Sequence, residues 1–407
     1  MDVVTLDRQL VSAARRVRIL GSLTWPSTLE SRFLTAWRAG APALPDPPPV
    51  TPPSGELAEP LADVVARADA EHPAGAFLIR TAESYLTAIQ LLRSAGTPGF
   101  LTASQALFGE PQLPPFDGAP TPLQEAEHLI EAAEAMSCAG PVATLSDEEA
   151  SARLSEAFPQ WFDDPLPVVL DPDLGSLAAA GSRRVRLRAG VRYTEAQVDQ
   201  LLQHEALVHA ATKRNGRRQP MLTSLGLSSP RTTATQEGLA TLAELMTNSM
   251  DLLRLRRIAL RVRAVHAATQ GADFIDVFEL LLEAGQPEVE AYRSTMRVFR
   301  GGDVRGGIPF TKDVVYLRGL REVHTFLLAA LREHRDDLPQ RLFLGRLTCG
   351  DALALGPLID NGTLLPAAIV PTWIQRSDHL AATLSWTVFG QHTPLHRIDL
   401  EDFLEDQ

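Results

Sequence analysis

The chain has 407 residues, of which 45% are apolar and 22% are charged, and its formal net charge is -12. This length allows two or three structural units, and the composition is that of a globular protein that favours helix. Because an acidic chain repels polyanions on average, we expect neither nucleic acid nor an anionic membrane surface as a partner.

The N-terminal part predicts helices on both sides of one proline-rich segment. Residues 1–38 place apolar side chains at helical spacing, and residues 41–60 follow as a linker that the prolines should hold as an extended strap. Between residues 57 and 140 we expect three helices, interrupted at His72–Pro73 and in the stretch 109–122. A hydroxyl residue followed three positions later by Gln or Glu predicts helix starts at Thr121, Ser146 and Thr194.

The pattern changes at residues 165–193. An apolar run at 166–170 and an alternating run at 185–188 predict short strands. Helical patterns then extend to about residue 336, and the tail 337–407 mixes helices with glycine-rich loops. The chain therefore predicts a mainly α protein with a small β-sheet, an α+β fold. We divide it into three parts: an N-terminal helix and linker (1–60), a helical region (61–160) and a catalytic domain (161–407).

Cysteine use and the absence of targeting patterns bear on the compartment. Cys138 and Cys349 are far apart and form no CxxC pair or disulfide framework. The first residues lack the basic and apolar segments of a secretory signal, and no run of about 18 apolar residues predicts a membrane span. We therefore expect a reduced, cytoplasmic protein without a membrane segment, and the oligomeric state stays open.

The chemistry of the sequence concentrates in Gln203-His204-Glu205-Ala-Leu-Val-His209, on the helix that begins after Thr194. Two imidazoles with a carboxylate beside the first are the parts of a hydrolytic zinc site. The histidines would hold the metal, which acidifies a bound water, and Glu205 would take the proton of that water.

The spacing of the two histidines is unusual. His204 and His209 are five residues apart, which separates them by about 140° on a regular α-helix, too far for both to meet one ion. A π-type turn, which adds one residue to a turn, would restore the register, and such turns concentrate at functional sites. We therefore predict a wide turn within residues 204–209.

A third ligand strengthens the zinc hypothesis, since a histidine pair on one helix more often makes unrelated polar contacts. Glu237 opens a helix 28 residues after His209, which leaves room for the chain to loop back to the same ion. His, His and Glu form a known catalytic zinc set with an open position for water. Glu237 could instead stabilise the start of its own helix, and Glu244 is a weaker ligand candidate.

Several ordered motifs resemble the microtubule-associated tyrosine carboxypeptidase family, over about residues 60 to 400. They are HEALVHA (204–210), Asn215-Gly216, Gln219-Pro220, TQEGLA (235–240), Phe310-Thr-Lys-Asp313, Tyr316-Leu-Arg-Gly319 and Leu344-Gly345. The sequence departs from the family at Arg346, where a lysine is expected. The resemblance implies a zincin-like metallopeptidase core with an HExxxH helix, one Zn²⁺ per chain on His204, His209 and Glu237, and Glu205 as the catalytic residue. It also implies removal of a C-terminal aromatic residue.

A carboxypeptidase needs a basic or phenolic group for the terminal carboxylate of its substrate. The segment 297–319 is the best source, with Arg305, Lys312, Tyr316 and Arg318 as candidates. Tyr316 could also polarise the scissile carbonyl, and we include it among the catalytic residues. The bland alternative is that Lys312 is an ordinary helix-start charge and Tyr316 a packing residue.

Other charged or polar features are interpreted as structural. The arginine run at 254–263 predicts a solvated or ion-paired face, because no aromatic residues or nucleic-acid-binding fold accompany it. His324 would be a surface residue, although it shares the expected helix of Tyr316. The strand at 185–188 could line a cleft by analogy with other zinc peptidases, but a core strand is the simpler interpretation.

The sequence thus predicts a zinc metallopeptidase, in particular a carboxypeptidase that removes a C-terminal Tyr or Phe from peptides or proteins through a Glu-activated, zinc-bound water. Two alternatives remain. The same site chemistry would serve a zinc-dependent hydrolase of a non-peptide amide, and a non-enzymatic, metal-binding regulatory protein would need only the ligands. A general base such as Glu205 has no use in a purely structural metal site.

Overall fold

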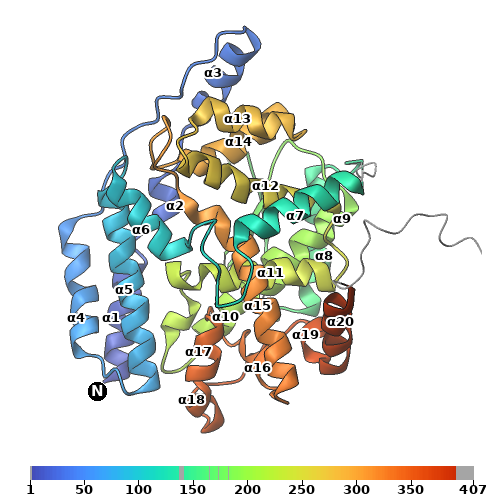
Figure 1. Ribbon diagram of the computed structural model, residues 1–407. Coiled ribbons are helices and arrows are strands. Elements are labelled where there is room, and N and C mark those ends of the chain that lie inside the picture. Colours follow the sequence, from blue (N-terminus) through green and yellow to red (C-terminus); the bar gives the residue numbers. More distant parts are fainter. Residues whose placement is uncertain (1, 137–141, 165, 173, 182, 391–407) are drawn as a thin grey trace, which may run out of the picture.

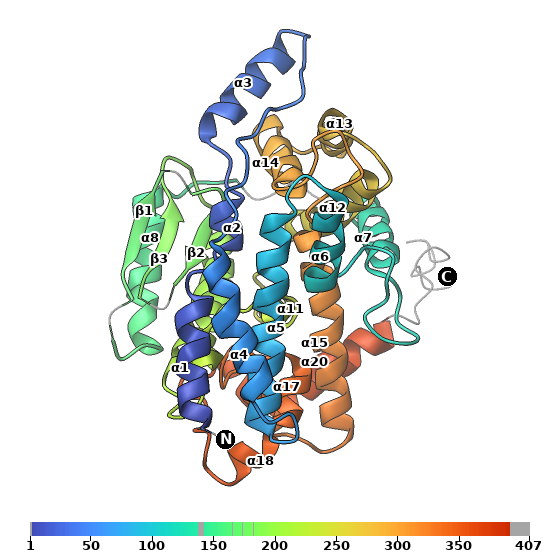
Figure 2. The same ribbon diagram turned by 90° about the vertical axis from the view of Figure 1, so that its left-hand side faces the viewer.

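The computed structural model describes residues 2–136, 142–164, 166–172, 174–181 and 183–390. Cys138 lies outside these ranges. Helices make up most of the described chain (Figure 1), and a three-stranded sheet stands at one side of it (Figure 2). The structure therefore confirms the mainly α fold with a small sheet. Within the described ranges, no helix combines the length and apolar character that a bilayer crossing requires.

The N-terminal helices cover one flank, where α1, α4 and α5 lie side by side (Figure 2). The expected helical segment 1–38 is divided into three helices, and Pro98 begins a separate α6 where we expected one continuous helix. Residues 41–54 contain no helix or strand and connect the protruding α3 to the next helix (Figure 1). The bounds are α1 (Val3–Ala14), α2 (Ile19–Ser22), α3 (Ser27–Arg38), η1 (Gly55–Leu57), α4 (Ala58–Arg67), α5 (Pro73–Arg93), α6 (Pro98–Phe108) and α7 (Pro122–Ala135).

The sheet is mixed and has the order β1-β3-β2. β1 (Val168–Asp171) pairs in parallel with β3 (Val185–Arg188), and β2 (Ala178–Ala180) pairs with β3 in antiparallel fashion. β3 is therefore the central strand, which supports its interpretation as a core strand. The edge strand β2, which we did not predict, contacts the motif helix instead. Two helical segments precede the sheet: α8 (Asp147–Ala157) and η2 (Phe158–Gln160).

The remaining helices surround the motif segment, and the three predicted capping boxes at Thr121, Ser146 and Thr194 are all present. The helices of the central part of the chain, several of which carry site residues, are α9 (Glu195–Leu201), the π-helix η3 (Leu202–Ala210), α10 (Ala211–Arg217), η4 (Thr223–Gly226), η5 (Pro230–Thr232), α11 (Thr233–Met246), α12 (Leu252–Thr269), α13 (Phe274–Glu283), α14 (Glu288–Phe299), η6 (Thr311–Val314) and α15 (Val315–Arg332). The C-terminal helices are α16 (Leu338–Arg341), α17 (Cys349–Ala354), α18 (Gly356–Asp360), α19 (Thr372–Gln375) and α20 (Ser377–Gly390).

The hydrophobic cores join segments that are distant in sequence. One cluster packs Leu10 of α1 and Leu61 of α4 against Leu225 and Leu344 from the second half of the chain. A second cluster joins Phe33 of α3 to helices α12–α15. The helices before residue 160 therefore support the segment that carries the motif, rather than packing only among themselves.

Candidate metal centre and active site

The histidine motif lies on the π-helix η3, which spans Leu202–Ala210 between two α-helices. The additional residue per turn brings the rings of His204 and His209 together, with centroids 4.8 Å apart and planes at 89°. A regular α-helix would separate these side chains around its circumference. The prediction of a wide turn within residues 204–209 is confirmed.

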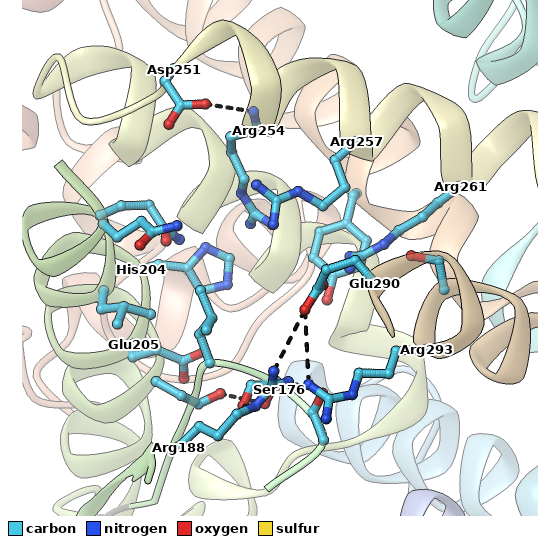
Figure 3. Close-up of a pocket in the computed structure, with 18 of the residues that line it drawn as sticks. Ser176, Arg188, His204, Glu205, Asp251, Arg254, Arg257, Arg261, Glu290 and Arg293 are labelled. Atoms are coloured by element: carbon cyan, nitrogen blue, oxygen red, sulfur yellow. Dashed lines mark hydrogen bonds and ion pairs between the residues drawn. The ribbon is translucent and has the colours of Figure 1, made fainter. Parts of the chain in front are cut away.

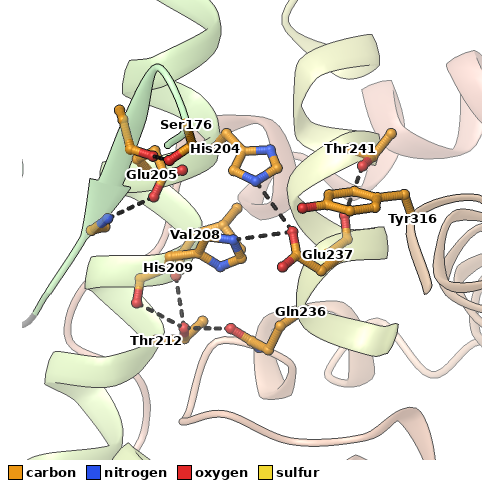
Figure 4. A network of polar contacts seen from close by, with 12 residues as sticks. Ser176, His204, Glu205, Val208, His209, Thr212, Gln236, Glu237, Thr241 and Tyr316 are labelled. Atoms are coloured by element: carbon orange, nitrogen blue, oxygen red, sulfur yellow. Dashed lines mark hydrogen bonds and ion pairs between the residues drawn. The ribbon is translucent and has the colours of Figure 1, made fainter. Parts of the chain in front are cut away.

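Glu237 of α11 completes a triangle of metal-ligating atoms. Its Oε2 lies 3.4 Å from Nε2 of His204 and 3.6 Å from Nε2 of His209 (Figure 4). One ligand atom from each of the three side chains lies within 4.8 Å of the other two. Two imidazole nitrogens and a carboxylate oxygen, converging in a mostly buried position, suit a divalent zinc ion.

The titration behaviour of the triad follows from its burial and its charges. Burial opposes ionisation of Glu237, but Lys312 and the two imidazoles outweigh it and hold the pKa of Glu237 well below its ordinary value. Burial likewise opposes charge on His204, yet contacts with Glu237 and Glu244 raise its pKa to about 10. For His209, burial dominates and lowers the pKa.

A close crossing of two helices places Glu237 beside the start of α15. A Cβ atom added at Gly238 would lie 2.1 Å from the backbone of Gly319, and one added at Gly319 would lie 1.9 Å from the carbonyl oxygen of Ala234. Glycine at both positions lets the backbones of α11 and α15 touch. The QEGLA and YLRG motifs are thus two halves of one helix contact.

This crossing brings two of the predicted side chains to the site. Nζ of Lys312 lies 3.4 Å from Oε1 of Glu237 and 5.3 Å from the ring centroid of Tyr316. Tyr316 lies beside Glu237 (Figure 4) and lines the adjoining cavity. The mostly buried Lys312 therefore balances the charge of a candidate metal ligand.

Glu205 points away from the triad, towards the sheet. Its Oε2 accepts a hydrogen bond of 2.7 Å from the backbone N–H of Ala180 on the edge strand β2 (Figure 4). Glu205 also lines the cavity together with His204. One oxygen of the carboxylate is therefore anchored to the sheet, at the wall of the cavity that His204 also lines.

Glu244, which we considered as a weaker ligand candidate, contacts one of the histidines instead. Its Oε1 contacts Nδ1 of His204 at 2.6 Å, on the side of the ring opposite to Glu237. Burial opposes its ionisation, but Arg254 and His204 outweigh it and lower the pKa of Glu244 to about 2. Glu244 is therefore a partner of a candidate ligand and lies outside the triangle of candidate ligand atoms.

A cavity of about 110 Å³ opens next to His204 and Glu205, and its walls are rich in arginine (Figure 3). Sequence analysis missed this group, because we interpreted the run 254–263 as a solvated or ion-paired face. That interpretation holds for Arg256 and Arg263, which pair with Glu134 and Glu127 of α7. The arginines that line the cavity are Arg188, Arg254, Arg257, Arg261, Arg293 and Arg297.

A signal for the cavity was present in the sequence. Arg254, Arg257 and Arg261 follow the spacing i, i+3, i+7, which places them on one face of α12. Arg254 pairs with Glu244, whereas Arg257 forms no hydrogen bond or ion pair with any other described residue. Nε of Arg261 is buried without a hydrogen bond, and the nearest carboxylate oxygen, on Asp313, is 3.9 Å away.

Two predicted substrate-binding residues lie elsewhere. Arg305 is exposed and pairs with Asp303 in its own loop. Arg318 pairs with Glu322 along α15 and lies against Gly109. Neither lines the cavity, since Arg305 lies in the loop between α14 and η6, and Arg318 lies beside the C-terminal end of α6. His324 bonds to Thr387 of α20 and has no part in the site.

The other motif residues hold the scaffold. The amide of Asn215 bonds to the backbone of Phe343 and Ile369, and Gln219 bonds to the backbone of Leu365. Nη2 of Arg346 donates to the carbonyl of His209 at 3.1 Å. Arg346, the departure from the family pattern, thus supports the end of the π-helix.

Comparison with known proteins agrees with these observations. No curated protein shows significant similarity to the chain. The family model described as microtubule-associated tyrosine carboxypeptidase matches residues 31–392, which is nearly the whole chain. It covers the π-helix, Glu237 and every arginine of the cavity. The chain therefore belongs to the microtubule-associated tyrosine carboxypeptidase family.

Proposed function

We propose that this protein is a zinc-dependent carboxypeptidase that removes a C-terminal aromatic residue, Tyr or Phe, from peptides or proteins. Family membership indicates carboxypeptidase activity, and thus a peptide or protein substrate. The observation that carries the zinc dependence is the convergence of His204, His209 and Glu237 through a π-helix. π-helices are rare and concentrate at functional sites, so this distortion supports a role for both imidazoles.

The chain's own residues can divide the hydrolysis between them. A zinc ion held by the three ligands would supply a Lewis acid that polarises the scissile carbonyl and acidifies water. Glu205, anchored by the Ala180 N–H, accepts the proton of the attacking water and passes it to the leaving amine. Tyr316 lines the same cavity, and its hydroxyl would donate a hydrogen bond to the developing oxyanion.

We assign capture of the substrate's terminal carboxylate to Arg257 and Arg261, in place of Arg305 and Arg318. A buried guanidinium is costly without an anionic partner, and these two lack a hydrogen-bonded carboxylate among the described residues. Planar guanidiniums bind a carboxylate in bidentate fashion and also stack on aromatic rings. The same cavity therefore suits both the carboxylate and the aromatic ring of a C-terminal tyrosine.

A panel of three peptides tests this proposal. Peptides of one sequence ending in free Tyr, free Phe or Tyr-amide are incubated with the zinc-loaded protein and followed by mass spectrometry. We expect loss of a single residue from the two free acids and no reaction of the amide. Internal cleavage would indicate an endopeptidase, and no cleavage of any peptide would contradict the proposed activity.

A further inference from the structure

Glu244 lies on the same helix as Glu237, seven residues later, and therefore on the same face of α11. The two carboxylates contact opposite edges of one imidazole. Glu237 Oε2 lies 3.4 Å from Nε2 of His204, and Glu244 Oε1 lies 2.6 Å from Nδ1 (Figure 4 shows the Nε2 side). One helix thus supplies both a candidate metal ligand and a partner for the ring of another.

Glu244 is itself held in place by two other elements. Gln200 of α9 donates to its Oε1 at 3.0 Å, and Arg254 of α12 donates to both oxygens, at 3.1 and 3.2 Å. The Glu244 side chain is fully buried. A buried carboxylate is tolerated where hydrogen bonds and an opposite charge satisfy it, and this one has both.

The second histidine has no such partner. Nδ1 of His209 is buried without a hydrogen bond to any described residue, while its Nε2 faces Glu237. Among the described residues, the hydrogen-bond donors near His209 act on its backbone, since Arg346 and Thr212 both donate to its carbonyl oxygen. Of the two histidines, only His204 therefore has a carboxylate in the described part of the chain that orients its ring through Nδ1.

We propose that Glu244 is a positioning residue for metal binding. It keeps the proton of His204 on Nδ1, which leaves the Nε2 lone pair directed at the metal, and Arg254 and Gln200 hold Glu244 for this task. Such carboxylate partners fix the tautomer and ring angle of ligating histidines, and their loss costs metal affinity about 10- to 100-fold. The inference rests on the proposed zinc site, but it concerns binding of the ion rather than turnover.

The arrangement also connects the metal site with the substrate cavity. Arg254 lines the cavity beside Arg257 (Figure 3) and at the same time binds Glu244. Its backbone N–H is fixed by Asp251, the N-cap of α12. One guanidinium therefore lies between the group that orients His204 and the space assigned to the substrate.

The zinc dissociation constant of Glu244→Gln, measured by competition with a chromophoric chelator, tests the proposal. The matched control is Glu127→Gln, which removes a carboxylate paired with Arg263 on the outer face of the same α12. We expect the zinc affinity of Glu244→Gln to fall about 10- to 100-fold, while Glu127→Gln binds zinc like the wild type. The visible absorption bands of the Co²⁺-loaded protein should shift in Glu244→Gln only, because they report ligand geometry.

A folded Glu244→Gln protein with wild-type zinc affinity and an unchanged cobalt spectrum would overturn the proposal. If this variant does not fold, Gln200→Leu replaces it, since it removes one support of Glu244 and keeps the ion pair with Arg254. The zinc affinity of Gln200→Leu should fall by a smaller factor. Wild-type zinc affinity in this variant would also overturn the proposal. A wild-type protein that binds no zinc contradicts the proposed function itself, whereas one that binds zinc without cleaving peptides leaves the role of Glu244 intact.

Discussion

Arg257 and Arg261 differ from the other arginines of the cavity because neither guanidinium makes a hydrogen bond to any described residue. Burial is the main cause that lowers the pKa of Arg261, to about 10, which shows how poorly its charge is compensated. At neutral pH it remains a cation. An anionic group of the substrate would supply the missing partner.

Replacement of Arg261 by Met therefore has a predictable effect. Loss of charge-assisted hydrogen bonds worth about 1.5–3 kcal/mol should lower kcat/KM for a peptide ending in free Tyr about 10- to 100-fold. Arg256→Met is the matched control, because Arg256 lies on the same helix and pairs with Glu134 away from the cavity. Steady-state kinetics on both variants decide the matter, and equal activities would remove Arg261 from the site.

At the scale of elements, the contact between α11 and α15 positions Glu237, the third candidate ligand. The backbones touch at Gly238 and Gly319, so a methyl group at Gly238 would collide with main-chain atoms that have no room to move. The helix propensity of alanine, worth about 1 kcal/mol over glycine, is too small to offset overpacking of this kind. The crossing is therefore intolerant of any side chain.

Gly238→Ala should separate the two helices and displace Glu237 from the histidines. We expect a loss of about 3 kcal/mol in unfolding free energy together with weaker zinc binding. Gly350→Ala provides the control, since Gly350 lies in helix α17 and an added Cβ would meet nothing closer than 3.8 Å. Urea unfolding measures both variants. A stable Gly238→Ala protein with normal zinc affinity would contradict this account of the crossing.

The elements also show what the sequence could and could not reveal. The five-residue spacing of His204 and His209 was sufficient to predict the π-helix, because only a wider turn lets both rings meet one ion. The edge strand β2 was missed since Ala178–Ala180 carries no strand signal of its own and depends on pairing with β3. The cavity was missed because the sequence does not show which arginines of α12 find acidic partners on α7.

At the scale of the whole molecule, buried ion pairs tie the N-terminal helices to the rest. Arg231 binds the buried Asp351 with both terminal nitrogens, and Arg80 of α5 approaches the same carboxylate at 3.3 Å. Burial opposes ionisation of Asp351, but the contacts with Arg231 outweigh it and lower its pKa. These contacts link α5, η5 and α17, which are distant in sequence.

A depressed pKa in the folded state gives the pH dependence of stability a definite sign. The pKa of an aspartate in the unfolded chain is about 3.9, so the contribution of Asp351 to stability is fully present at pH values well above this. It is lost as the pH falls further towards the lower folded pKa, because the unfolded chain then binds more protons. The folded protein should thus weaken steeply below about pH 4.

Urea unfolding between pH 6 and pH 3 measures this effect. Asp351→Asn should destabilise the protein at pH 6 by about 3–5 kcal/mol, because it leaves the mostly buried guanidinium of Arg231 without its anion. It should also flatten the loss of stability towards pH 3. Asp46→Asn changes an exposed carboxylate in the strap and should alter neither quantity. If the unfolding free energy of Asp351→Asn fell with pH as steeply as that of the wild type, this assignment to Asp351 would be contradicted.

The central claim is that three side chains hold a zinc ion while Glu205 performs the proton transfer. The most direct test is the cleavage rate of a Tyr-ending peptide by zinc-loaded Glu205→Gln, with its zinc content determined in the same sample. We predict one zinc per chain, as in the wild type, and a rate reduced by at least about 100-fold. Cleavage at the wild-type rate, or loss of the zinc from this variant, would contradict the assigned roles.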